Sequence, residues 1–244
     1  MDAIRIDALT RCFGSRRAVD GLNLTVGEGE LFALLGQNGA GKTTTIRMLC
    51  GLLTPTSGDA LLMGRSVVTD TQAVKQLINV SPQETAVAAR LTVRENLEFV
   101  AGVYGFDRRA ARAKAQEMME TFSLTDRAKD RAKTLSGGMQ RRLSIAMALI
   151  SKPKILFLDE PTLGLDVRAR RELWKHIGTL KGTMTIVLTT HYLEEAEALA
   201  DRIAIMSAGK LAALGTAEQI RESVGAATLE DAFLTLTEAE EVEQ

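Results

Sequence analysis

The chain has 244 residues, 45% of them hydrophobic, which is enough for one large domain with an ordinary buried core. Its 30 lysines and arginines nearly balance 31 aspartates and glutamates, and the formal net charge of -1 argues against a protein that coats nucleic acid. The first residues show no basic region followed by an apolar one, and the longest apolar runs fall far short of the roughly 20 residues that cross a bilayer. We therefore predict a cytoplasmic protein with at most a peripheral membrane role.

The strands expected from the sequence are of two kinds. Residues 4–9 and 21–26 alternate apolar and polar side chains, which predicts half-buried antiparallel strands at the front of the chain. Residues 31–35 are continuously apolar and stop at Gly36, as in a strand that helices cover on both faces. We therefore predict an α/β fold with a mostly parallel sheet and an N-terminal antiparallel β subdomain. Three later runs repeat the buried-strand pattern: 155–158, 185–188 and 203–206.

A phosphate-binding loop follows the first buried strand. Residues 36–43 read GQNGAGKT, match GxxxxGK[ST], and precede a helix predicted over 44–52. Backbone N–H groups of such a loop surround phosphate oxygens, Lys42 neutralises the β and γ phosphates, and Thr43 offers a hydroxyl to Mg²⁺. The alternative is a chance match in a glycine-bearing loop, and the strand before it argues against that. The predicted nucleotide-binding residues here are Gly36, Gln37, Asn38, Gly39, Ala40, Gly41, Lys42, Thr43 and Thr44.

Residues 84–150 lose strand character, and their apolar residues recur at helical spacing. We predict an inserted α-helical subdomain here, with Met118 and Met119 in its core rather than in a ligand site. The three helical stripes are Val93, Leu97, Val100, Ala101, Tyr104; Ala111, Ala115, Met118, Met119, Phe122; and Met139, Leu143, Ala146, Ile150.

The third stripe opens with the sequence LSGGMQ at residues 135–140. A serine hydroxyl and glycine N–H groups at a helix N-terminus form a candidate anion site, made by Ser136, Gly137 and Gly138. Read alone, these residues are equally typical of a capping serine with two turn glycines. We favour the anion site because the chain then has two phosphate-binding surfaces on different subdomains.

Two adjacent carboxylates end the buried strand in ILFLDE, residues 155–160. Open α/β sheets bind ligands at this edge, so Asp159 is predicted to hold Mg²⁺ through its water shell and Glu160 to reach the water that attacks the γ-phosphate. The alternative is an acidic helix cap ahead of Pro161. The phosphate loop makes that interpretation the weaker one.

The two histidines have different expected roles. His191 follows the predicted strand 185–190 at the ligand edge and can donate a hydrogen bond to the γ-phosphate, although a lone histidine at a strand end is usually structural. His176 is expected to be a solvated residue of a helix. The predicted catalytic residues are therefore Lys42, Glu160 and His191.

These motifs together resemble the ATP-binding subunit of the ABC transporter family. The resemblance covers residues 1–223 and rests on the order of Phe13, GQNGAGKT, Gln83, LSGGMQ, ILFLDE, LGLD at 163–166, and His191.

The resemblance implies a P-loop NTPase core with ATP and Mg²⁺ as cofactors. It implies that Phe13 stacks on adenine and that Asp166 communicates across a dimer. Gln83 would sense Mg²⁺ and the attacking water while contacting a membrane subunit, so the implied metal-site residues are Thr43, Gln83 and Asp159.

The assembly implied by the resemblance is a head-to-tail pair of subunits. Ser136, Gly137 and Gly138 of one chain would close over ATP held by Lys42 and Thr43 of the other. Because all motifs are intact, a homodimer is the simplest pair, and a dimer with a similar ATPase subunit is the alternative. An integral membrane permease would be a separate partner, and no nucleic acid is expected. The subunit would lie on the inner face of the cell membrane.

A finer likeness concerns the type of transporter. Residues 51–58, 190–197 and 229–237 are similar to the bacterial drug-export branch, such as daunorubicin-resistance-type subunits. This implies export of a drug or a lipid-like substrate. Gln37 stands where the family more often has proline.

A different class of function remains as the alternative, namely an ABC ATPase that acts on ribosomes or DNA. Such proteins typically fuse two cassettes or insert long coiled coils, and this sequence has neither. We expect one ATPase domain at 1–223, with its helical subdomain at about 84–150, and a short tail at 224–244. The acidic end of the tail, 238–243, is expected to be frayed.

Overall fold

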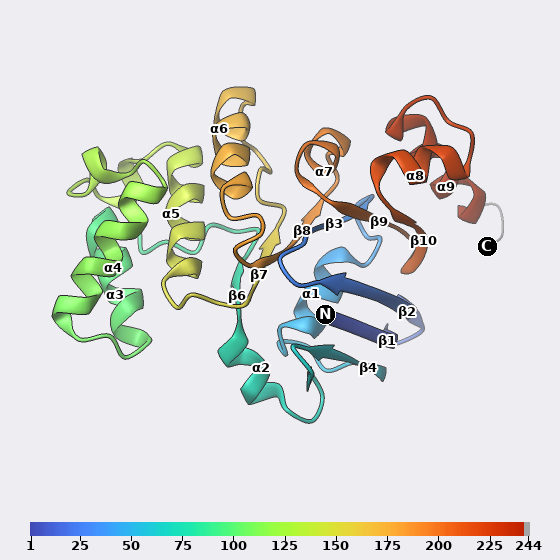
Figure 1. The fold of residues 1–244 in the computed structure, drawn as a ribbon, viewed down its shortest axis with the longest axis horizontal. Helices are drawn as coiled ribbons and strands as arrows, with labels where there is room; N and C mark the ends of the chain where they lie inside the picture. The colour runs from blue at the N-terminus through green and yellow to red at the C-terminus, as the bar shows by residue number, and fades with distance from the viewer. Residues whose placement is uncertain (242–244) are drawn as a thin grey trace.

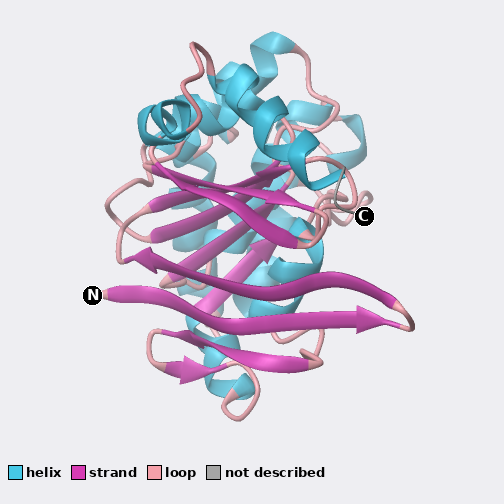
Figure 2. Cartoon of the chain, turned by 90° about the vertical axis from the view of Figure 1, so that its right-hand side faces the viewer, coloured by secondary structure: helices cyan, strands magenta, loops and turns pink. Residues whose placement is uncertain are grey.

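The computed structural model describes residues 1–241, which form two sheets with helices packed against them (Figure 1). The first sheet is antiparallel, with strand order β2-β1-β4-β5. Its strands are β1 (Asp2–Phe13), β2 (Arg16–Gly27), β4 (Ser57–Leu62) and β5 (Arg65–Ser66). The strand that starts at N in Figure 2 is β1, and together with β2 it forms a long hairpin.

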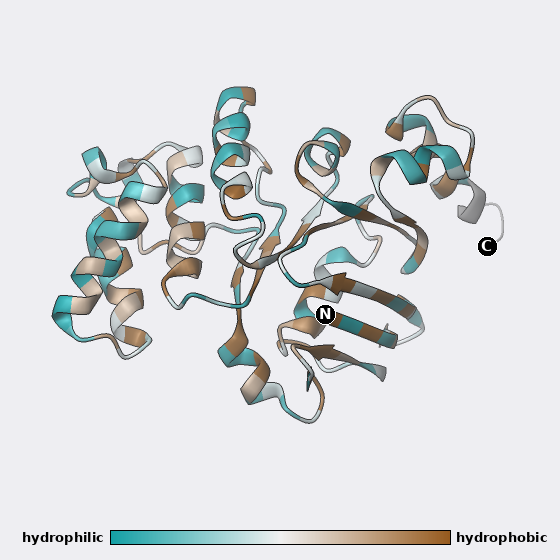
Figure 3. Ribbon diagram, in the orientation of Figure 1, coloured by the Kyte–Doolittle hydropathy of each residue, from teal (hydrophilic) through white to brown (hydrophobic). Residues whose placement is uncertain are grey.

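The two antiparallel strands predicted at the front of the chain are confirmed as parts of β1 and β2. Their alternation of hydrophobic and hydrophilic residues can be followed in Figure 3. Ile4 and Ile6 are buried while Arg5 between them is exposed, because successive side chains of a strand point to opposite faces. This sheet therefore covers the second sheet with one apolar face.

The second sheet is mostly parallel, as predicted, with strand order β10-β9-β3-β8-β7-β6. Three of its strands are buried at every residue, which explains their continuous apolar sequences. Strand β10 is antiparallel to β9 and was not predicted. The strands are β3 (Leu31–Gly36), β6 (Ile78–Ser81), β7 (Ile155–Asp159), β8 (Thr185–Thr190), β9 (Arg202–Ser207) and β10 (Lys210–Gly215).

Short helices connect and flank these strands. Helix α1 spans Lys42–Leu49, so it begins two residues before the predicted helix and ends three residues earlier. It stops there because Gly51 adopts a left-handed conformation with φ of 61°. The other helices of the sheet region are α2 (Thr71–Leu77), α6 (Val167–Gly178) and α7 (Leu193–Leu199).

The predicted helical insertion lies at the left in Figure 1 and consists of α3 (Val93–Val103), α4 (Arg108–Thr121) and α5 (Gly137–Leu149). A capping box between Thr92 and Glu95 starts α3, because each side chain satisfies a backbone N–H of the other residue. Met118 and Met119 are buried in the main apolar cluster, so their prediction as core residues is confirmed.

The chain ends in α8 (Ala217–Ser223) and α9 (Leu229–Glu241). The tail packs on the rest of the chain through Leu229 and Ala232, which are buried in the main cluster. The acidic end was expected to be frayed from residue 238, but it is helical as far as Glu241, and residues 242–244 lie outside the described part of the chain. Within residues 1–241, no helix is both long and apolar enough to cross a membrane.

One expectation about the core is wrong. His176 was predicted to be solvated, but it is half-buried, with its ring centroid 5.4 Å from that of Phe122. Burial, with the nearby charge of Arg142, lowers the pKa of its imidazole because the charged form is less well solvated there. Phe122 belongs to the helical insertion, so His176 contacts the insertion from α6.

Candidate nucleotide site

The glycine-rich loop joins the carboxyl end of β3 to the start of α1. Lys42 is the first residue of the helix, and its Nζ turns back to donate to the carbonyl oxygens of Gly36 (2.8 Å) and Gln37 (3.1 Å). Gly41 has a φ of 103°, and a Cβ there would collide with the carbonyl oxygen of Ala18. The loop therefore needs glycine at this position in order to present its backbone and a buried ammonium together.

A hollow of about 440 Å³ opens beside this loop, which is within the size range of small-molecule sites. Most of the residues predicted for the glycine-rich loop line it, whereas Gly36, Gln37 and Ala40 do not. Gly36 and Gln37 instead supply the carbonyl oxygens that hold Lys42. The lining residues are Phe13, Arg16, Ala18, Asn38, Gly39, Gly41, Lys42, Thr43, Thr44, Gln83, Glu160, Leu163 and His191.

Thr43 and Asp159 bring two oxygen ligands together at one side of the loop. The Thr43 hydroxyl donates to Oδ1 of Asp159 over 3.1 Å, and the Thr189 hydroxyl donates to the same oxygen over 2.6 Å. Strand register explains the second contact, since Asp159 of β7 pairs with Thr189 of β8. A hydroxyl and a carboxylate fit Mg²⁺, which takes a few protein oxygens and completes its shell with phosphates and water. Gln83, the third predicted metal residue, is exposed at the rim of the hollow.

The three predicted catalytic residues lie in contact although they come from three separate segments. The Glu160 carboxylate is buried, with Oε1 3.4 Å from Lys42 Nζ and Oε2 2.8 Å from His191 Nδ1. A carboxylate held in this way can accept a proton from a water molecule beside it. Glu160 also has a φ of 47°, a left-handed conformation that a non-glycine residue rarely adopts.

Arg141 of α5 is a residue of the site region that the sequence analysis did not identify. Its guanidinium is buried and donates to the carbonyl oxygens of Pro82, Gln83, Asp159 and Pro161. Burial lowers the pKa of this side chain to about 10, which leaves it charged at neutral pH. Nothing in the spacing of a single sequence distinguishes this arginine from the adjacent Arg142.

Phe13 lies at the end of β1 on the wall of the hollow and is 49% exposed. The Arg11 guanidinium carbon lies 4.7 Å from the centre of its ring, and Arg11 also donates to the carbonyl oxygen of Thr54 over 2.8 Å. This contact orients the ring through a cation–π attraction. The exposed area of Phe13 is therefore available to a flat ligand.

The LSGGMQ segment lies apart from the hollow that contains Lys42. Ser136 caps α5 by accepting from Met139 N, and Asp166 caps α6 by accepting from Ala169 N. With Gly138 they line a second hollow of about 280 Å³, and no lining residue is common to both hollows. The capping role of Ser136 is thus present in the structure. Its role toward a nucleotide stays a prediction, because one chain does not bring the two segments together.

The strand–loop–helix unit, the buried lysine and the carboxylates at the strand ends define a P-loop nucleoside triphosphatase. Comparison with known families matches residues 19–163 to the ABC transporter family. The chain belongs to the ABC transporter family, as its ATP-binding and ATP-hydrolysing component.

Relatives and solved structures agree with this assignment. The chain is 43% identical over 224 residues to the daunorubicin resistance ATP-binding protein DrrA3 of Streptomyces coeruleorubidus, covering 91% of this chain and 71% of that protein. It is 40% identical over 227 residues to the linearmycin resistance ATP-binding protein LnrL of Bacillus subtilis, covering 93% and 73%. A solved ATP-binding subunit of an ABC transporter superposes with a TM-score of 0.84 at 28% identity, covering 96% of this chain and 99% of that one.

Proposed function

We propose that this chain powers export through a separate membrane permease, and that it docks on the permease through an apolar patch on α3. The patch consists of Phe99, Val103 and Tyr104, which are 63%, 70% and 47% exposed. Phe99 and Val103 lie on α3 and Tyr104 caps its end, and three large apolar side chains so exposed together are typical of a protein contact surface. This α3 patch is the observation that carries the proposal.

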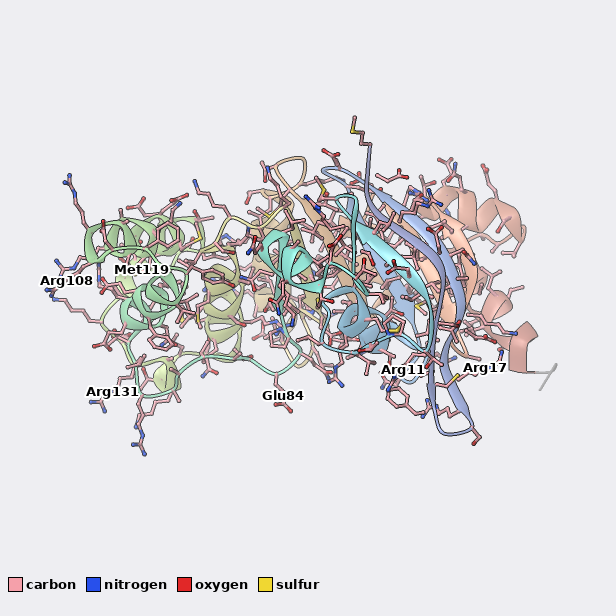
Figure 4. The ribbon with its side chains drawn as sticks, turned by 90° about the horizontal axis from the view of Figure 1, so that it is seen from below. Arg11, Arg17, Glu84, Arg108, Met119 and Arg131 are labelled. Carbon is pink, nitrogen blue, oxygen red and sulfur yellow. The ribbon has the colours of Figure 1, made fainter. Side chains whose placement is uncertain are left out.

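The α3 patch adjoins the loop that carries Gln83. A shallow hollow of about 150 Å³ links the two, since its lining includes Pro82, Ala86, Val100 and Tyr104. Glu84, the next residue of the loop, points away from the body of the protein in Figure 4. A partner seated on the α3 patch would therefore touch the loop that lines the nucleotide site.

The names of the relatives support a lipophilic substrate. Two matched proteins are named for resistance to daunorubicin and linearmycin, and a third, 42% identical over 227 residues, is the human phospholipid-transporting ATPase ABCA3. The chain covers 13% of that human protein, so the likeness concerns a small part of it. We propose a drug or a lipid-like molecule as substrate and the inner face of the cell membrane as the place of action.

The working unit that we propose is a head-to-tail homodimer. The hollow that contains Lys42 and the hollow that contains Ser136 are separate in one chain, and each chain has both. Two copies facing each other would form two equivalent sites, in which Ser136 and Gly138 of one copy close over ATP bound at Lys42 of the other.

Each site residue then has a defined task in hydrolysis. Lys42 neutralises phosphate oxygens, Glu160 accepts the proton of the attacking water, and His191 orients Glu160 and donates to the γ-phosphate. Thr43 and Asp159 would hold Mg²⁺, which neutralises charge that develops on the phosphates. Closing on ATP and opening after hydrolysis would move the helical subdomain and the permease seated on it.

The test is co-purification of this chain with a membrane permease, for which the proposal predicts a neighbouring gene. Phe99→Glu should abolish co-purification and drug efflux from cells while leaving the ATPase rate of the isolated chain unchanged, because α3 does not line the nucleotide hollow. Leu234→Glu on α9 is the matched control, since Leu234 is an apolar residue of similar exposure, 45%, at the other end of the molecule (Figure 1). The proposal would be contradicted if Phe99→Glu still co-purified with the permease and still supported drug efflux. Sedimentation of the chain with ribosomes would also contradict it.

A further inference from the structure

Arg141 connects three parts of the chain that are far apart in sequence. It lies on α5, which sits between the α3–α4 pair and the sheet edge formed by β6 and β7 (Figure 1). Its side chain leaves the helix on the sheet side and is 3% exposed. The same face of α5 is anchored to β6 by the hydroxyls of Ser144 and Ser81, which lie 3.0 Å apart.

The guanidinium uses its two sides for two different segments. Nε donates to the Pro161 carbonyl over 2.8 Å and Nη2 donates to the Asp159 carbonyl over 2.7 Å. Nη1 donates to the carbonyls of Pro82 and Gln83. A planar fork of fixed donors is suited to hold two segments at one separation, which a single ammonium cannot do.

The first pair of acceptors flanks Glu160. The carbonyls of Asp159 and Pro161 stand on either side of this residue, and its own N–H donates to Thr189. Glu160 is the residue with a φ of 47°, so its backbone needs support from its surroundings to keep this conformation. The same backbone conformation directs the Glu160 carboxylate toward Lys42 and His191.

We propose that Arg141 is a positioning residue for ATP hydrolysis, which holds the strained backbone of Glu160 and fixes it relative to the loop of Gln83. Arg141 lines neither the nucleotide hollow nor the hollow at Ser136, so it acts through these two segments and not on the nucleotide. A shift of α5 changes the place of Glu160 and Gln83 together, which links the helical subdomain to the catalytic base.

The test is the steady-state ATPase of the full chain with Arg141→Met, which keeps an unbranched apolar stem and removes all the donors. We expect kcat to fall about 10- to 100-fold, because misplacing a reacting group by about 1 Å has an effect of this size. KM and the Kd for Mg-ATP should stay unchanged, because the glycine-rich loop and Lys42 are untouched.

Asn96→Ala is the control for a loss of stability alone. Asn96 is 1% exposed, similar to the 3% of Arg141. Its side chain accepts from the Ala88 N–H over 2.8 Å and donates to the Ala88 carbonyl over 3.2 Å, in the segment that follows Gln83. It has no contact with the segment around Glu160, so its variant should have a lowered melting temperature and wild-type kcat. An equal fall of kcat in both variants would overturn the proposal, as would a wild-type kcat in Arg141→Met.

Arg141→Lys provides the measurement if the methionine variant does not fold. Lysine retains the charge but carries its donors on one nitrogen, so it cannot span both segments. We expect an intermediate kcat with unchanged KM. A wild-type kcat in Arg141→Lys, or a rise of KM in step with the fall of kcat, would show that Arg141 does not position the base.

Discussion

His191 and Glu160 form a close pair, with Nδ1 of the histidine 2.8 Å from Oε2 of the glutamate. The other carboxylate oxygen lies 3.4 Å from Lys42 Nζ, so the glutamate is held between two nitrogen groups from different segments. His191 is the first residue after β8, Glu160 follows β7, and these strands are adjacent and parallel. The pairing of β7 with β8 therefore brings the Glu160 carboxylate and the His191 imidazole within hydrogen-bonding distance.

Glu160→Gln should stop hydrolysis and leave binding intact. Removal of a positioned general base lowers a rate by about 10²- to 10⁴-fold, while Lys42, Thr43 and Asp159 still bind Mg-ATP. The change also removes one negative charge near each triphosphate, so a closed dimer should persist. Phosphate release and size-exclusion chromatography with ATP measure the two effects. Asp159→Asn is the contrast, with weaker Mg²⁺ binding and no trapped dimer. Near-normal turnover in Glu160→Gln would move the role of base to His191.

Phe13→Ala should raise the Kd for ATP several-fold. The exposed ring offers a stacking surface, and stacking reads the flat face of a base rather than its edges, so discrimination against GTP should stay weak. Nucleotide titration of the purified chain gives both affinities. An unchanged Kd would mean that the Phe13 ring only packs against Arg11 and does not contact the nucleotide.

Mixing two inactive variants should restore activity if the site is shared between chains. Ser136→Arg disables the LSGGMQ segment and Lys42→Ala disables the glycine-rich loop, and a dimer of one of each has one site with both residues intact. ATPase activity should therefore appear on mixing, up to about half of the wild-type rate per dimer if the sites act independently. Failure to recover activity in a verified mixed dimer would show that each chain completes its own site.

Glu195→Gln should stabilise the protein at neutral pH. Glu195 is fully buried on α7, where Oε1 accepts from Trp174 Nε1 over 3.0 Å, and burial raises the pKa of its carboxyl above the ordinary value of 4.5. The folded state therefore binds a proton at the Glu195 carboxyl more tightly than the unfolded state does. Stability contributed by Glu195 is complete below the unfolded pKa and is lost as pH rises through the folded pKa. Glutamine retains the acceptor oxygen without the charge.

Melting temperatures from about pH 5 to about pH 8 check this prediction. The gain of Glu195→Gln over wild type should be largest at the alkaline end and should shrink toward pH 5, with each kcal/mol worth roughly 2–4 °C in a chain of this size. Glu194→Gln is the matched control, because the adjacent Glu194 side chain is 83% exposed and should show no such trend. A gain of equal size at every pH would contradict a role for the buried charge.

Several predictions from the sequence alone are confirmed by the structure because they depend on local patterns. Continuous apolar runs predicted β3, β7, β8 and β9, and apolar residues at helical spacing predicted α3, α4 and α5. The meeting of Lys42, Asp159, Glu160 and His191 was also predictable. Each lies at or after the carboxyl end of a parallel strand of one sheet, and the carboxyl ends of such strands share an edge.

Other features depend on contacts between distant segments and could not be read from the chain. Strand β5 has only two residues, and β4 pairs with β1 from a distant part of the sequence, so their own patterns are weak. His176 is half-buried only because α6 lies against Phe122 of the helical insertion. The prediction for the buried face of α5 was also incomplete, because the helical spacing identified Leu143 and Ala146 but not the charged Arg141.

The sequence by itself determined the class of chemistry, because the residues that bind phosphate and move a proton must follow particular strands in a particular order. Only the tertiary structure decided how these residues are held. The four carbonyl oxygens around Arg141 come from two segments that meet when α5 packs on β6 and β7. The separation of Ser136 from Lys42 likewise follows from where the helical insertion docks. Packing geometry of this kind arises from many weak contacts summed over the whole fold, and no local sequence pattern encodes it.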